Sequence, residues 1–131
     1  MKTLIVDDDF VCRLLLQELL KGYGSCHIAV NGKEAVEGVR MALEVGQPYD
    51  LICLDIMMPE MDGQQALKEI RALEEITETT LRRRARIVMT TADSDNASVL
   101  TAIQEDCDYF LIKPIRKDKL LETLRTMSLI D

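Results

Sequence analysis

Side chains that could do chemistry stand directly after several short apolar runs. Asp7 and Asp8 follow the first run and Asp55 follows a later one, while two further runs end in Thr90, Thr91 and Lys113. If these runs are adjacent strands, the three carboxylates share a pocket and repel one another at neutral pH. A hard cation relieves that repulsion, and Mg²⁺ accepts a few carboxylates with water and a carbonyl. A lysine and a hydroxyl beside such a site suit phosphoryl transfer.

A simpler interpretation is that aspartates at strand ends only cap helices. It suits Asp9, which precedes an apolar helical pattern, and it partly suits Asp7. It does not suit Asp55, because I-M-M-P follows it rather than a helix start. A site therefore accounts better for the coincidence of several polar strand ends.

The apolar runs alternate with longer amphipathic segments. Strands are predicted at 4–6, 26–30, 50–54, 86–90 and 109–112. Helices are predicted after each of them, at about 10–21, 31–44, 63–75, 94–105 and 116–127. Five βα units in 131 residues predict one α/β domain with a parallel sheet covered on both faces. In doubly wound sheets, sites lie beyond the carboxyl ends of the strands.

Two patterns predict which side chains face the core. The first helix has an apolar stripe at helical spacing, formed by Val11, Leu14, Leu15 and Leu19. In the second strand, an apolar set alternates with Ser25, His27 and Ala29, namely Cys26, Ile28 and Val30. That alternation is typical of a sheet edge that is exposed on one face.

Composition excludes several classes of function. The formal net charge of −7 argues against binding to nucleic acid or to an anionic membrane. Every apolar run is too short to span a bilayer, and no signal peptide precedes the first strand, so a cytoplasmic protein is expected. His27 and the four cysteines lack zinc-ligand spacing, which favours reduced and mostly buried thiols at Cys12, Cys26, Cys53 and Cys107.

Four motifs carry a resemblance to a known family. They are L-I-V-D-D-D at 4–9, L-D-I-M-M-P-E-M-D-G at 54–63, T-A at 91–92 and K-P at 113–114. In these motifs the chain resembles the receiver domains of two-component response regulators, over essentially its whole length. The resemblance implies that residues 1–131 are a single receiver domain. It also implies a flavodoxin-like, doubly wound (βα)₅ fold with strand order 2-1-3-4-5.

The resemblance also implies the roles of the residues at the strand ends. Asp55 is then the phosphoacceptor, and Thr91 and Lys113 contact the phosphoryl group. The implied cofactor is Mg²⁺, with Mn²⁺ as a substitute. Its ligands are Asp8 directly, Asp7 mainly through water, Asp55, and the backbone carbonyl of Met57.

Further roles follow from the same resemblance. Phe110 stands where the family places an aromatic switch that responds to Thr91, although a plain core role is the alternative, and the adjacent Tyr109 competes for the position. The Lys113–Pro114 peptide is expected to be cis. Met57 and Asp93 are expected to flank the path of the water that hydrolyses the acyl phosphate, and so to control self-dephosphorylation.

The expected function is phosphorelay signalling rather than turnover of an external substrate. The implied phosphodonor is a histidine kinase or a phosphotransfer protein. The implied target is a protein that binds the face formed by the fourth helix, fifth strand and fifth helix. A monomer or a weak, phosphorylation-dependent dimer is expected, with no direct nucleic-acid binding and no membrane insertion. The last helix ends close to residue 131, so either a stand-alone receiver or a piece of a longer chain fits.

Two segments depart from the family pattern. Residues 73–86 form a long, charged connection, which we interpret as a helix end followed by a solvated loop; a partner-specific docking loop is the alternative. Asp106, Cys107 and Asp108 stand where receivers often carry a Gly-Ala turn.

Three other functions fit parts of the sequence. The run from Asp7 to Val11 also fits the D-x-D-x-V motif of haloacid-dehalogenase-type phosphatases, with Asp7 as nucleophile and Asp9 as acid/base. That reading lacks a late acidic pair and leaves Asp55 unexplained. A flavodoxin-like nucleotide binder lacks the glycine-rich loop that holds phosphate. An adaptor that never needs phosphorylation would not require the complete set of pocket residues.

Overall fold

The computed structural model describes residues 1–58, 60–77, 84–92 and 107–131. Its five parallel strands lie in the order β2-β1-β3-β4-β5, as expected. They are β1 (Thr3–Val6), β2 (Cys26–Ala29), β3 (Leu51–Asp55), β4 (Arg86–Thr91) and β5 (Tyr109–Ile112). The described helices are α1 (Phe10–Leu20), the 3₁₀ turn η1 (Lys21–Tyr23), α2 (Gly32–Glu44), α3 (Gly63–Ile76) and α5 (Lys117–Thr126). The helix predicted at 94–105 lies outside the described residues.

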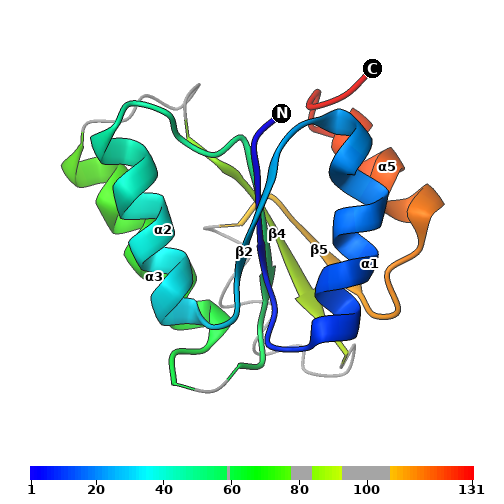
Figure 1. Cartoon of the computed structure of the whole chain (residues 1–131), viewed down its shortest axis with the longest axis horizontal. Coiled ribbons are helices and arrows are strands. Elements are labelled where there is room, and N and C mark those ends of the chain that lie inside the picture. Colours follow the sequence, from blue (N-terminus) through cyan, green and yellow to red (C-terminus); the bar gives the residue numbers. More distant parts are fainter. Residues whose placement is uncertain (59, 78–83, 93–106) are drawn as a thin grey trace.

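The helices cover both faces of the sheet. Figure 1 shows α2 and α3 on one side and α1 and α5 on the other. Along β1, Leu4 and Val6 pack toward α2 and α3, while Ile5 packs toward α1 and α5. Such two-sided burial explains why the central strands are continuous apolar runs. No helix among the described residues is long and apolar enough to cross a membrane.

The buried face of α1 differs from the predicted stripe. Leu16 and Leu20 are buried against the sheet, whereas Val11, Leu14 and Leu15 of the predicted stripe are exposed and only its fourth member, Leu19, packs against the core. The helix is apolar around most of its circumference, so its sequence pattern is compatible with either of two buried faces. Only the one that meets the sheet is buried, and a second apolar surface faces outward.

The edge position of β2 is confirmed, but its burial pattern is not. Ile28 and Val30 are more than a third exposed, and Ala29 is the buried residue. Because β2 pairs only with β1, the flanking helices leave its outer margin uncovered. The four cysteines are reduced thiols, as predicted, but the expectation that they are mostly buried is wrong, because only Cys53 is fully buried. Burial raises the pKa of its thiol to about 12, which makes it unreactive.

Short polar side chains start three of the helices. Asp9 accepts a hydrogen bond from the Val11 N–H at 2.9 Å, and Asp62 accepts one from the Gln65 N–H at 2.9 Å. Asn31 starts α2 in the same way by accepting from the Glu34 N–H at 2.8 Å. These caps fix where α1, α2 and α3 begin, next to the carboxyl ends of the strands.

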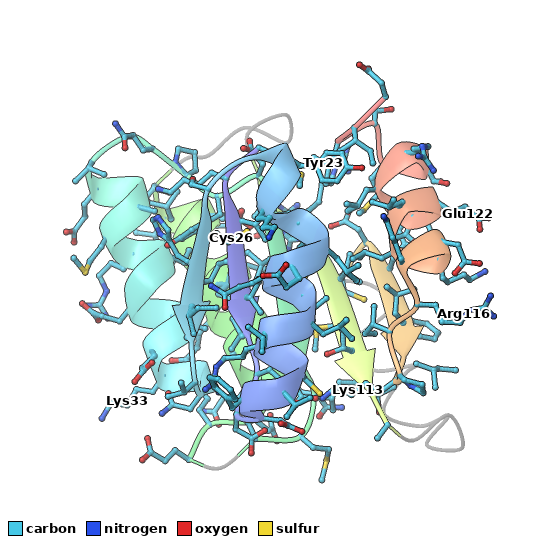
Figure 2. The ribbon with its side chains drawn as sticks, turned by 45° about the vertical axis from the view of Figure 1, so that its right-hand side comes forward. Tyr23, Cys26, Lys33, Lys113, Arg116 and Glu122 are labelled. Atoms are coloured by element: carbon cyan, nitrogen blue, oxygen red, sulfur yellow. The ribbon has the colours of Figure 1, made fainter. Side chains whose placement is uncertain are left out.

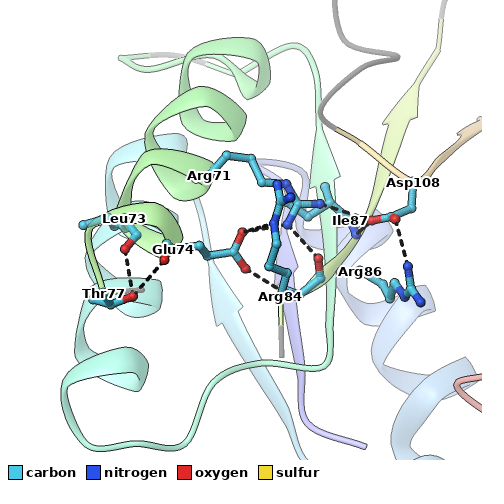
Figure 3. Close-up of polar contacts among 9 residues, drawn as sticks. Arg71, Leu73, Glu74, Thr77, Arg84, Arg86, Ile87 and Asp108 are labelled. Atoms are coloured by element: carbon cyan, nitrogen blue, oxygen red, sulfur yellow. Dashed lines mark hydrogen bonds and ion pairs between the residues drawn. The ribbon is translucent and has the colours of Figure 1, made fainter. Parts of the chain in front are cut away.

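The described residues at the two ends of the charged segment 73–86 take part in a partly buried polar network. Glu74 is buried, and its carboxylate binds Arg71 at 2.7 Å and the Ala85 N–H at 2.8 Å (Figure 3). Arg71 also reaches Asp108 at 3.2 Å, and Asp108 accepts from the Ile87 N–H at 2.8 Å. The acidic residue in place of the usual turn therefore anchors β5 to β4. Residues 78–83 and 93–106, including Asp93 and Asp106, lie outside the described part.

Candidate functional site

The register of the sheet brings the predicted site residues to one edge. Val6 is paired with Leu54, so the next residues, Asp7 and Asp55, lie on neighbouring strand ends. Thr91 is paired with Ile112, which precedes Lys113. Figure 2 shows Lys113 just beyond the end of β5, whereas Cys26 lies at the start of β2.

Three carboxylates form a cluster at this edge. One oxygen atom each from Asp7, Asp8 and Asp55 lies within 4.8 Å of the other two. Asp7 and Asp55 are buried, and Asp8 is exposed. A cation entering from solvent would therefore meet Asp8 first and neutralise the two buried charges behind it. Oxygen ligands of this kind fit Mg²⁺ or Mn²⁺.

Lys113 supplies the positive charge that the buried carboxylates need. Its Nζ lies 2.8 Å from Asp7 Oδ2 and 3.5 Å from Asp55 Oδ1. Burial opposes the charge on the lysine, but the hydrogen bond to Asp7 and the charges of both aspartates outweigh it. The pKa of Lys113 is therefore raised, and the side chain remains a cation.

Asp55 has an unusually high affinity for a proton. Burial and, after it, the charge of Asp7 raise its pKa from 3.8 to about 6, although Lys113 acts in the opposite direction. The carboxylate is therefore ionised at neutral pH, but its charged form is less stable than that of an exposed aspartate. An environment of this kind favours any cation or reaction that removes the negative charge.

One backbone N–H and one arginine side chain hold Asp7 in place. The Asp9 N–H donates to Asp7 Oδ1 at 2.9 Å, and the Arg13 guanidinium donates to the Asp7 carbonyl oxygen at 2.9 Å. Sequence reasoning missed Arg13. Its position on the first turn of a helix that starts beside the acidic pair was the available signal.

Gly63 is required because the chain folds back tightly behind Asp55. Its N–H donates to the Ile56 carbonyl at 2.9 Å. A Cβ at this position would lie 2.2 Å from the Asp55 carbonyl oxygen, which no side chain tolerates. The glycine that closes the 54–63 motif thus lets α3 begin directly against the strand end.

The ends of β3, β4 and β5 are tied together by backbone hydrogen bonds. The Ile56 N–H donates to Thr90 O at 3.0 Å, and the Lys113 N–H donates to Thr91 O at 2.7 Å. Thr91 is buried at the end of β4, beside the strand that carries Lys113. Met57, two residues after Asp55, is largely exposed.

The structure also describes two of the three remaining predicted positions. Phe110 is partly buried and packs against the core cluster on the α2–α3 side, a location compatible with either a core or a switch role. The Lys113–Pro114 peptide is cis, as predicted. Asp93 lies outside the described residues, so its expected place beside the pocket stays a prediction.

The site geometry disfavours a phosphatase of the haloacid-dehalogenase type. In that mechanism Asp9 would be the acid/base, but here it caps α1. Its hydrogen bond from the Val11 N–H lowers the pKa of the carboxyl group. A general acid needs a raised pKa, so the structure gives Asp9 a different task.

Comparison with known proteins identifies the family. A family model described as the response regulator receiver domain matches residues 3–125. This chain belongs to the receiver family. The receiver is 35% identical over 125 residues to the chemotaxis protein CheY of Bacillus subtilis strain 168, with 94% of this chain and 93% of that protein covered. CheY of Thermotoga maritima is 33% identical over 129 residues, with 97% of each chain covered.

Solved structures agree with this assignment. The receiver domain of the histidine kinase CKI1 from Arabidopsis thaliana, complexed with Mg²⁺ and BeF₃⁻, matches with a TM-score of 0.85 and 29% identity. The match covers 97% of this chain and 89% of that one. The receiver domain of the sensor kinase PA1611 from Pseudomonas aeruginosa, with a magnesium ion in its active-site cleft, gives 0.78 and 26%, with 97% of each chain covered.

The receiver is therefore a CheY-like signalling domain of the two-component phosphorelay type, with the flavodoxin-like fold. Domains of this family transmit signals and are not turnover enzymes in the ordinary sense. The family binds Mg²⁺ at an acidic pocket, and the cluster of Asp7, Asp8 and Asp55 could hold such an ion.

Proposed function

We propose that this receiver accepts a phosphoryl group on Asp55 from a phosphohistidine of a histidine kinase or phosphotransfer protein. The observation that carries the proposal is the position of Asp55 between a carboxylate cluster and a lysine. One carboxylate oxygen each of Asp7 and Asp8 lies within 4.8 Å of one of Asp55, close enough for the three to share a cation, and Lys113 lies 3.5 Å from an Asp55 oxygen. A bound cation and the lysine would both offset the negative charge of a phosphoryl group that approaches the Asp55 carboxylate.

The chemistry is a displacement at phosphorus. An oxygen of ionised Asp55 forms the new P–O bond as the P–N bond to the donor imidazole breaks, and the imidazole keeps the electron pair and takes a proton. Asp7, Asp8, Asp55 and the Met57 carbonyl would hold Mg²⁺, which supplies positive charge to the phosphoryl oxygens. Lys113 leaves Asp7 for those oxygens, because the product carries more charge on the Asp55 side.

An exposed apolar surface beside the pocket suits the docking of the donor. Phe10, Val11 and Leu14 of α1 are exposed, and α1 begins directly after the acidic pair. The donor must bring its histidine to Asp55, so it must also cover the nearby end of α1. Its contact surface should therefore be apolar at this place.

The output is a change of protein-binding surface. In this proposal the Thr91 hydroxyl moves to the new phosphoryl oxygens, and Phe110 on the adjacent strand turns toward the space it leaves. Phosphorylation can shift the equilibrium between two existing conformations only if the phosphoryl group makes different contacts in each of them. Thr91→Ala should therefore be phosphorylated normally, yet show smaller amide shifts at residues 107–125 with beryllofluoride. Equal shifts in both proteins would exclude Thr91 from the switch.

Intact mass spectrometry tests the acceptor. The receiver is incubated with a small acyl phosphate and Mg²⁺, and the gain of one phosphoryl group is expected. EDTA and Asp55→Asn should each abolish the gain. Asp118→Asn is the matched control, because Asp118 is an exposed aspartate on α5 that should not affect labelling. Equal labelling of the Asp55→Asn variant would refute the assignment.

A further inference from the structure

A cavity of about 500 Å³ lies at the end of the sheet opposite Asp55. It is lined by residues 46–50 before β3, by Arg84 and Arg86 at the start of β4, and by residues 127–129 after α5. Figure 1 shows that both chain termini lie at this end of the molecule. The volume is in the usual range for a small-molecule site.

The two arginines of the cavity are only partly neutralised (Figure 3). Buried Arg71 takes the short contact with Glu74, at 2.7 Å, and also binds Asp108. Arg84 reaches the same Glu74 oxygen only at 3.5 Å, and Arg86 reaches Asp108 only at 3.3 Å. Among the residues that the structure describes, three guanidinium groups thus contact two carboxylates, and the two that line the cavity have the longer contacts.

The cavity also contains one acidic residue, Asp50, and the Lys2 ammonium lies against the cavity lining. Asp50 Oδ2 already accepts from the Lys2 N–H at 2.7 Å, and the Lys2 ammonium donates to the Gln47 carbonyl at 2.6 Å. The ionised side chains in this network are four cations and three anions: Lys2, Arg71, Arg84, Arg86, Asp50, Glu74 and Asp108. These seven side chains therefore sum to one positive charge, whereas the chain as a whole has a net charge of −7.

We propose that this cavity binds the phosphate group of a small phosphorylated molecule through Arg84 and Arg86. Guanidinium groups bind phosphate with paired, charge-assisted hydrogen bonds, and both groups keep N–H donors beyond their single contacts with carboxylates. Ser128, which also lines the cavity, adds a hydroxyl. The site is independent of phosphorylation at Asp55, because the two lie at opposite ends of the strands.

An NMR titration with inorganic pyrophosphate tests the site. The experiment uses the whole chain in EDTA, so that the carboxylate pocket holds no metal. We expect saturable amide shifts at residues 46–50 and 127–129. The double variant Arg84→Gln/Arg86→Gln should bind at least about tenfold more weakly. Arg84→Lys/Arg86→Lys should fall between the two, because it keeps the charges but loses the fork geometry.

Arg116→Gln is the matched control, because Arg116 is an exposed arginine at the start of α5 and should leave the titration unchanged. The proposal is overturned if the wild type shows no saturable shifts at these amides, or if the glutamine double variant titrates like wild type. It is also overturned if pyrophosphate shifts only the amides near Asp55. Binding of a hexaglutamate peptide but not of pyrophosphate would assign the cavity to an acidic protein segment instead.

Discussion

The ammonium group of Lys113 lies closer to Asp7, at 2.8 Å, than to the proposed phosphoacceptor Asp55, at 3.5 Å. The lysine thus mainly neutralises Asp7, a proposed metal ligand, and has Asp55 as a second, more distant partner. A cation at the carboxylate cluster must compete with this ammonium for both aspartates. Phosphorylation would then give the lysine a stronger partner on the Asp55 side.

Lys113→Met should therefore bind Mg²⁺ more tightly than the wild type. We expect a gain of about threefold to tenfold, since removing one nearby cation is worth roughly 1 kcal/mol in a partly solvated site. Calorimetric titration at pH 8, where the carboxylates are ionised, measures it. Lys117→Met, at an exposed lysine, is the control. Weaker binding in Lys113→Met would mean that the lysine organises the metal ligands instead of competing with the metal.

The raised pKa of Asp55 predicts a pH-dependent cost in stability. The folded state holds this proton up to a pH of about 6, whereas the unfolded chain releases it near 3.8. The contribution of Asp55 to the free energy of unfolding therefore decreases as the pH rises from about 4 to 6, and it stays at this lower value above pH 6. In EDTA at pH 7.5, Asp55→Asn should unfold with a free energy higher by about 1–3 kcal/mol.

Urea unfolding at pH 7.5 and pH 4 checks this sign. The advantage of Asp55→Asn should shrink toward zero at pH 4, where Asp55 of the folded protein is protonated. Asp118→Asn, at an exposed site, should match the wild type at both values. An Asp55→Asn protein that is less stable than the wild type at pH 7.5 would show that the ionised carboxylate is stabilised rather than strained.

The strand-end residues could be predicted because the topology makes them converge. Once five βα units are recognised, parallel pairing places Asp7, Asp55 and Lys113 at the carboxyl-terminal edge of the sheet, independently of the loop conformations. The helix faces were harder to predict. Helix α1 is apolar on two sides, and only contact with the sheet decides that Leu16 is buried while Leu14 is not.

Long-range polar contacts were not predictable from local patterns. Arg71 and Glu74 look like an ordinary surface pair at helical spacing, and Asp108 looks like part of a turn. Their burial depends on how the end of α3 packs against the starts of β4 and β5. Arg13 was missed for a similar reason, because its partner is a backbone carbonyl that no side-chain motif records.

Arg71 should be a major contributor to stability. Arg71→Gln leaves the buried Glu74 carboxylate without its closest cation and weakens the anchor of Asp108. Loss of one partner of a buried ion pair costs about 3–5 kcal/mol. Arg40→Gln is the control, because Arg40 and Glu37 form an exposed pair at the same helical spacing that should contribute less than about 1 kcal/mol. Similar unfolding midpoints in urea for the two variants would contradict the buried network.

Met57 should influence how long the phosphorylated state lasts. Its thioether offers no hydrogen-bond donor to order an attacking water, and its flexible side chain, exposed in this state, can turn over the phosphoryl group. Met57→Asn should raise the hydrolysis rate by about tenfold, if one aligned hydrogen bond is worth ~1.4 kcal/mol in the transition state. The decay of phosphoprotein after removal of the donor, at constant Mg²⁺, measures it. Met41→Asn, at a remote exposed methionine, should decay like the wild type, and unchanged or slower decay in Met57→Asn would remove this side chain from the account.

Chemical mapping of the phosphoryl group shows directly whether Asp55 is the phosphoacceptor. Borohydride reduces an aspartyl phosphate to homoserine, which peptide mapping by mass spectrometry assigns to one position. After treatment with a small acyl phosphate and Mg²⁺, homoserine is expected at position 55 and nowhere else. Homoserine at Asp7 in place of Asp55 would contradict the account, and would support the phosphatase-type nucleophile that the same acidic run could encode.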